Sequence, residues 1–199
     1  MTTSRLEAFS DGVFGIAITL LVLEIRVPES TRNLLHELAV LWPSYLGYAI
    51  SFLVIGLIWA NHHAMFVHIG TVNRTLMFAN TLLLMSVALI PFTAAVLASA
   101  FRSGNGQRTA VVLYGGTLVV GGLLFNWIWA HARRDHHLLD SNISAVQARS
   151  MGQRFMLGPA LYLVGTLLGA IQPIVGTGVF ALLILFYWLP ITAGSRKAV

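Results

Sequence analysis

The chain has 199 residues, of which 57% are hydrophobic and only 10% are charged. A soluble domain carries about 25% charged residues, so this composition excludes an ordinary soluble domain and indicates a protein of the lipid bilayer. The absence of cysteine excludes disulfides and thiolate metal sites. The net charge of +5 would suggest nucleic acid in a soluble protein, but the basic residues here lie between apolar segments. We therefore expect no nucleic-acid partner, no soluble substrate, no metal and no cofactor.

Six apolar segments are each close to the length of about 20 residues that a helix needs to cross hydrocarbon. They cover residues 9–26, 41–59, 76–98, 110–130, 155–171 and 174–190. Residues 27–39 are expected to form a polar connection, and residues 131–153 the longest polar stretch. In the third segment, Asn80, Ser86 and Pro91 are predicted to be packing and kink residues. The pattern predicts an all-α integral membrane protein with six transmembrane helices.

The basic residues predict how these helices are oriented. Cytoplasmic loops of membrane proteins carry an excess of Lys and Arg. With the N-terminus inside, eight basic residues lie on the inner side: Arg5, Arg74, Arg133, Arg134, Arg149, Arg154, Arg196 and Lys197. Four lie on the outer side: Arg26, Arg32, Arg102 and Arg108. We therefore expect a single multi-pass domain over residues 1–199, in the cell membrane, with both termini cytoplasmic and the basic inner loop in contact with anionic lipid.

The first apolar segment carries an acid at its entrance. From Gly12 to Leu23 the segment has no charge, and its only hydroxyl is that of Thr19. A carboxylate at the edge of hydrocarbon is costly unless it is paired or hydrated. Asp11 is therefore predicted to bind a basic or polar residue of a neighbouring helix in preference to an ion.

The same segment carries an aliphatic stripe. On a helix that turns about 100° per residue, Ile16, Leu20 and Leu23 fall on one face, whereas Asp11 lies about 140° away from Ile16. The stripe is either an ordinary packing surface or the hydrophobic constriction of a narrow pore, which is a known gating device. Glu24, at the outer end, either concentrates cations at a pore mouth or faces solvent.

Two adjacent histidines follow the second segment. His62 and His63 point in different directions on a helix and have no carboxylate beside them, so they are a poor metal site. The inner end of this segment lies at the depth where the first segment begins. A histidine or Asn61 is therefore predicted to contact Asp11 or Ser10. With Arg5, these residues would form a structural network that holds the first helix; a protonation sensor is the alternative.

The beginning of the chain resembles the signature R-x-x-x-F-S-D-G of the TMEM175 family, in which an Ile- and Leu-rich helix follows. The matching residues are Arg5, Phe9, Ser10, Asp11 and Gly12. Further similar positions follow in the second and third segments: Trp59, His62, His63, Phe66, Asn80, Pro91 and Phe92. The resemblance is specific through the third segment and weak in the last three.

The resemblance implies a potassium-permeable cation channel, a homotetramer whose central pore is lined by the first helix. Ile16, Leu20 and Leu23 occupy the positions of the family's aliphatic constriction, and Thr19 a position linked to potassium preference. The T-V-G-Y-G filter of ordinary potassium channels is absent from the sequence. K⁺ is then the permeant ion.

Other functions remain open from the residues alone. A proton-leak channel of the same architecture is one alternative, and a secondary transporter is another. Transporters usually carry broken helices and midplane charges in two repeats, and this chain has neither apart from Pro91. An intramembrane enzyme is not expected, because the seven acids are scattered and mostly stand at segment ends.

Overall fold

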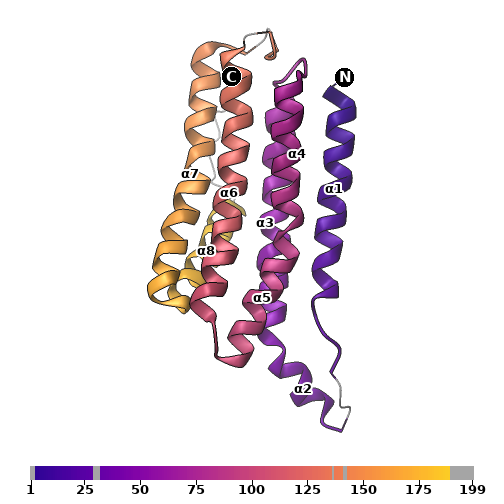
Figure 1. The fold of residues 1–199 in the computed structure, drawn as a ribbon, viewed down its shortest axis with the longest axis vertical. Helices are drawn as coiled ribbons and strands as arrows, with labels where there is room; N and C mark the ends of the chain where they lie inside the picture. The colour runs from indigo at the N-terminus through magenta and orange to yellow at the C-terminus, as the bar shows by residue number, and fades with distance from the viewer. Residues whose placement is uncertain (1–2, 29–31, 136, 141–142, 189–199) are drawn as a thin grey trace, which may run out of the picture.

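The computed structural model describes residues 3–28, 32–135, 137–140 and 143–188, with side chains as far as Leu185. Every regular element in these ranges is a helix (Figure 1). The helices are α1 (Thr3–Leu23), α2 (Leu34–Val40), α3 (Trp42–Phe66), α4 (Arg74–Ala88), α5 (Ile90–Ser103), α6 (Gln107–Arg134), α7 (Ala145–Ile171) and α8 (Pro173–Trp188). The end of the segment predicted over 174–190, and the basic residues Arg196 and Lys197, lie outside the described residues.

Five helical stretches are long and apolar enough to cross a membrane. They are α1, α3, the combined α4–α5 unit (Arg74–Ser103), α6 and α7. The apolar part of α8, Pro173–Leu185, is shorter. The prediction of an all-helical membrane protein is confirmed, with five long apolar helices and a sixth that is shorter as described.

Three boundaries differ from the sequence prediction. Residues 34–40, expected within a polar connection, form α2, because Leu, Ala and Glu are good helix formers and no Gly or Pro interrupts them. Helix α3 continues past Trp59 to Phe66, again without a helix breaker, so both histidines are helical. Helix α7 begins ten residues before the predicted Phe155, at Ala145, where Ser144 and Gln147 form a capping box.

The third apolar segment is broken at Leu89. Helix α4 ends at Ala88 and α5 begins at Ile90, with Pro91 in its first turn. Proline is tolerated there because the backbone N–H that it lacks has no partner within the helix in the first turn. The predicted role of Pro91 as a kink residue agrees with this position.

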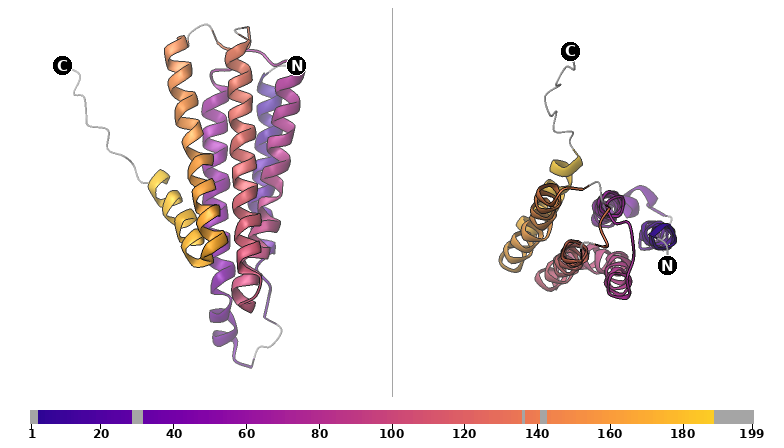
Figure 2. Two further views of the ribbon diagram at one scale, coloured as in Figure 1. Left: turned by 60° about the vertical axis from the view of Figure 1, so that its left-hand side comes forward. Right: turned by 90° about the horizontal axis from the view of Figure 1, so that it is seen from above.

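The helices form one elongated bundle with α1 at one edge (Figures 1 and 2). Helix α1 packs against α3, α4 and α5, whereas α6 packs against α7, and α8 lies mainly against α7. Small residues permit the close approach of α6 and α7, as is common in membrane helix pairs. At Gly122, an added Cβ would stand 2.7 Å from Cβ of Pro159.

The two loops at the end of the bundle that carries the N-terminus are joined to each other. A single antiparallel bridge pairs Ile69 with Leu139. Beside it, the amide of Gly70 donates to the carbonyl of Leu138 (2.8 Å), and the amide of Asp140 donates to the carbonyl of His68 (2.9 Å). These bonds tie the α3–α4 connection to the α6–α7 connection.

Candidate functional site

Helix α1 has a packing face and an exposed face. Its buried side chains recur at helical spacing and point toward α3, α4 and α5: Leu6, Ser10, Phe14, Ala17 and Leu21. The stripe residues are exposed by 62% at Ile16, 41% at Leu20 and 73% at Leu23. At about 100° per residue, the centre of the stripe lies roughly 110° around the helix from the centre of the packing face. The stripe therefore faces away from the bundle to which α1 belongs.

Two signature residues share the exposed side of α1. The ring of Phe9 is 54% exposed and lies about 20° from the direction of Ile16. Gly12 is also exposed, and an added Cβ there would meet nothing within 4 Å. The exposed side of the helix is therefore apolar from Phe9 to Leu23, with the exposed Arg5 before it and the hydroxyl of Thr19 beside it.

Thr19 is exposed beside the stripe. Its Oγ1 lies 3.1 Å from the carbonyl oxygen of Gly15 and 2.9 Å from that of Ile16, so its one hydroxyl proton is directed back to the helix. The oxygen keeps lone pairs that point outward. Thr19 can thus accept a hydrogen bond from water, or contact a cation, without losing its bond to the helix.

Asp11 binds α3 through an indole. Its Oδ1 accepts a hydrogen bond of 2.9 Å from Nε1 of Trp59. Within the part of the chain that the structure describes, Arg5 is exposed and forms no ion pair with Asp11. The carboxylate therefore has a polar partner on a neighbouring helix, and that partner is neither Arg5 nor a histidine.

A buried chain of hydrogen bonds joins α1, α4 and α3. Ser10 Oγ donates to the carbonyl of Leu6 (2.8 Å) and accepts from Nδ2 of Asn80 (3.0 Å). Asn80 Oδ1 lies 2.9 Å from Nε2 of His62. The Leu6 carbonyl can only accept, and this sets the direction of each following bond. His62 must then donate from Nε2.

Aromatic rings enclose the imidazole of His62. The ring stacks on Phe66 at 4.3 Å between centroids and meets Phe14 edge-on at 5.4 Å. The structure thus brings His62 to Ser10 through Asn80, and not to Asp11. His63 is exposed, and among the described residues it forms no hydrogen bond with Ser10, Asn80 or His62.

The sequence pattern did not assign two members of the site to it. Asn80 was expected to pack, and it is the bridge between Ser10 and His62. The available signal was an amide in the middle of an apolar segment, which requires a partner. Trp59 was noted only within the family pattern, and its indole N–H is the donor to Asp11.

No group of three or more His, Cys, Asp or Glu side chains that could hold a metal ion occurs among the described residues. The site is built from one aliphatic face, one hydroxyl and a polar anchor on the opposite side of α1. An arrangement of this kind can line a passage or a contact surface, and it offers no paired acid and base for bond-breaking chemistry.

Comparison with known proteins identifies the class of membrane protein to which this chain is similar. The family described as "Endosomal/lysosomal potassium channel TMEM175" matches residues 5–91. A protein from Streptomyces collinus, named a potassium channel, is 42% identical over 187 residues, which are 93% of this chain and 91% of the relative. A crystal structure described as a lysosomal potassium-selective channel TMEM175 homolog from Chamaesiphon minutus superposes with a TM-score of 0.83 at 38% identity, covering 93% of this chain and 95% of that one.

The human relative matches a shorter part of this chain and has a different name. It is 37% identical over 101 residues, which are 46% of this chain and 20% of the human protein, and it is named an endosomal/lysosomal proton channel. The matched proteins are membrane ion channels and not enzymes. This chain belongs to the TMEM175 family.

Proposed function

We propose that the protein is a potassium-permeable channel in which α1 of four identical chains lines a central pore. The observation that carries the proposal is the exposure of Ile16, Leu20 and Leu23 on the edge helix of the bundle, on a face that its own chain leaves uncovered. One helix cannot enclose a pore, so several copies of α1 must meet. The names of the bacterial relatives as potassium channels support the choice of ion.

Conduction in this proposal is controlled by wetting. Rings of Ile16, Leu20 and Leu23 expel water when the pore is narrow, and a dry apolar segment blocks ions. When the rings separate, a partly hydrated cation passes. Aliphatic rings offer no oxygen ligands, so selectivity for potassium over sodium is modest and arises at the hydroxyl of Thr19, whose outward lone pairs order the water of the ion.

Charge at the pore mouth and anchoring of the helix complete the proposal. Glu24 is exposed just beyond the outer end of α1, where a carboxylate raises the local concentration of cations. The signature residues on the packing side, with His62, hold α1 at a fixed rotation so that the stripe faces the axis. Both termini lie in the cytoplasm, and residues 1–199 form one channel unit.

The name of the human relative makes proton permeation the alternative. A flux assay separates the two ions. The purified protein is reconstituted into liposomes under a potassium gradient, and potassium and proton movements are followed with separate indicators. Potassium flux above that of protein-free liposomes is expected. Flux of protons alone would favour the alternative, and saturable flux at low turnover would favour a transporter.

A single substitution tests the pore-lining face. Ile16→Asn places an amide in the proposed constriction, so we expect a higher conductance and a weaker preference for potassium over sodium. Val22→Asn is the matched control, because Val22 is also exposed on α1 but lies about 120° away from Ile16. If Ile16→Asn and Val22→Asn conduct alike, with unchanged selectivity, the stripe is a packing surface and the proposal is wrong.

A further inference from the structure

A groove separates α3 from α7 over the half of the bundle that carries the N-terminus. Helix α8 packs against both of these helices, and its Phe180 ring lies against the ring of Tyr162 on α7 at 6.2 Å. Closer to the N-terminal end of the bundle, two adjoining cavities of about 330 and 690 Å³ lie beside α7. Both are lined by Met151 and Arg154, so the two cavities meet at these side chains.

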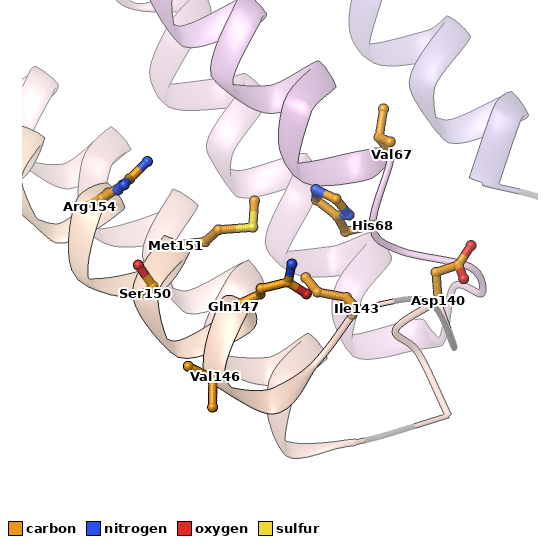
Figure 3. A pocket seen from close by; sticks show the side chains of 9 residues that line it. All are labelled: Val67, His68, Asp140, Ile143, Val146, Gln147, Ser150, Met151 and Arg154. Atoms are coloured by element: carbon orange, nitrogen blue, oxygen red, sulfur yellow. The ribbon is translucent and has the colours of Figure 1, made fainter. Parts of the chain in front are cut away.

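The two cavities differ in chemistry. The smaller one lies among α3, α6 and α7 and is lined mainly by aliphatic and aromatic side chains, among them Leu57, Ile58, Leu118, Phe125 and Phe155. The larger one lies at the end of the bundle, where His68, Asp140, Gln147 and Ser150 contribute polar groups (Figure 3). The groove is thus apolar within the bundle and polar at the end of the bundle.

Arg154 stands at the boundary between the two cavities. Among the residues that the structure describes, its guanidinium has no hydrogen-bond or ion-pair partner. Arg133, Arg134 and Arg149 line a neighbouring cavity of about 450 Å³, which shares Asp140 with the polar cavity. Nε of Arg133 is buried and has no hydrogen-bond partner in the described part of the chain. Four arginines and one acid thus line these three cavities, and such an excess of positive charge attracts anions.

We propose that this groove is a binding site for an anionic phospholipid. An acyl chain occupies the apolar cavity, the phosphate binds Arg154, and the headgroup lies in the polar cavity. A soluble anion would match the arginines but would leave the apolar cavity unused. An apolar peptide segment would match the cavity but not the charge. In the proposed orientation of the channel this end of the bundle faces the cytoplasm, so the lipid would belong to the cytoplasmic leaflet; only this placement rests on the proposed function.

Lipid retention by the protein tests whether the positive charge of Arg154 selects an anionic lipid. The purified protein in detergent is mixed with equal amounts of phosphatidylglycerol and phosphatidylcholine, and bound lipid is counted by native mass spectrometry. We expect phosphatidylglycerol to be retained about fivefold more strongly, with Arg154→Gln abolishing that preference. Arg108→Gln, at the exposed start of α6 on the other side of the membrane, should retain it. Equal retention of both lipids by the wild type, or equal losses in both variants, would overturn the proposal.

A substitution that fills the apolar cavity tests whether an acyl chain occupies it. Gly158 lines the apolar cavity, and an added Cβ there would meet nothing within 4 Å. Gly158→Leu should therefore fold and displace the chain, so that retention of phosphatidylglycerol falls at least about tenfold, as expected when two or more buried CH₂ groups are displaced. Gly116→Leu adds the same side chain to open space on α6, outside the two cavities, and should retain the lipid.

Two further results would assign the groove to another occupant. Displacement of bound phosphatidylglycerol by an equal concentration of glycerol phosphate would show a site for a soluble phosphate. A change of oligomeric mass in Gly158→Leu, with lipid retention unchanged, would show a contact between copies of the chain. Either result overturns the lipid site and leaves the channel proposal to the flux assay, which uses a different face of the molecule.

Discussion

Replacing Asn80 by leucine should destabilise the protein while leaving the conduction of assembled channels intact. The substitution keeps a similar volume but removes the two bonds that join α4 to Ser10 of α1 and to His62 of α3. Hydrogen bonds between membrane helices contribute about 0.6–1.7 kcal/mol each. The expected loss in the free energy of unfolding is therefore about 1–3 kcal/mol, or roughly 2–12 °C in Tm for a chain of this size.

The assay is thermal unfolding of the purified protein in one detergent, with oligomeric mass measured by light scattering before heating. Thr81→Val is the control, because Thr81 is exposed on the same helix and its hydroxyl donates only to the carbonyl of Met77, one turn earlier. A loss for Asn80→Leu that lies within about 0.5 kcal/mol of the control would refute the reasoning.

A double-mutant cycle sharpens the result. Ser10→Ala removes the acceptor of the Asn80 amide, so the double variant with Asn80→Leu should lose less stability than the sum of the two single losses. Additivity within about 0.5 kcal/mol would mean that Ser10 and Asn80 act independently. Single-channel conductance of the assembled Asn80→Leu variant should equal that of the wild type, because the stripe lies on another face of α1.

Substitutions at two further contacts, Trp59 with Asp11 and Gly122 with Pro159, probe the packing of the bundle. Trp59→Phe keeps an aromatic ring but removes the donor to Asp11, and should lower the free energy of unfolding by about 1 kcal/mol in the same thermal assay. Asp11→Ala should then cost less in that variant than in the wild type, because the bond is already lost. Gly122→Ala forces a Cβ to 2.7 Å from Pro159 and should cost about 1–3 kcal/mol. Gly116→Ala enters open space and should be neutral or stabilise by up to about 1 kcal/mol; equal losses in both glycine variants would contradict the close packing of α6 on α7.

The features of α1 that follow from helical periodicity were accessible from the sequence. A rotation of about 100° per residue separates Ile16, Leu20 and Leu23 from Asp11 in any helix, and the structure places them on different sides. Long apolar runs likewise predicted membrane helices. Whether the stripe lines a pore could not be decided, because a lone helix carries no information about which of its faces a second chain will cover.

The partners of the signature residues depend on how helices meet. Asp11 binds Trp59 across 48 positions, and Ser10 binds Asn80 across 70. Spacing within one segment cannot reveal which residue of another helix lies at the same depth and rotation. The choice of His62 over His63 was also out of reach, because it depends on the rotation of α3 against α1, and one residue step turns a side chain by about 100°.

The separation of the two faces of α1 also has a consequence for how the protein can change. Side chains of the stripe contribute little to the packing of their own bundle, since they are largely exposed in it. In the proposed channel, exchanges among aliphatic residues at Ile16, Leu20 and Leu23 should therefore alter pore width at little cost to folding of the single chain. Exchanges at Ser10, His62 or Asn80 should do the opposite: they should destabilise the single chain and leave the stripe unchanged. If the stripe lines the pore as proposed, permeation can change by small steps on one side of a helix whose other side keeps the fold constant.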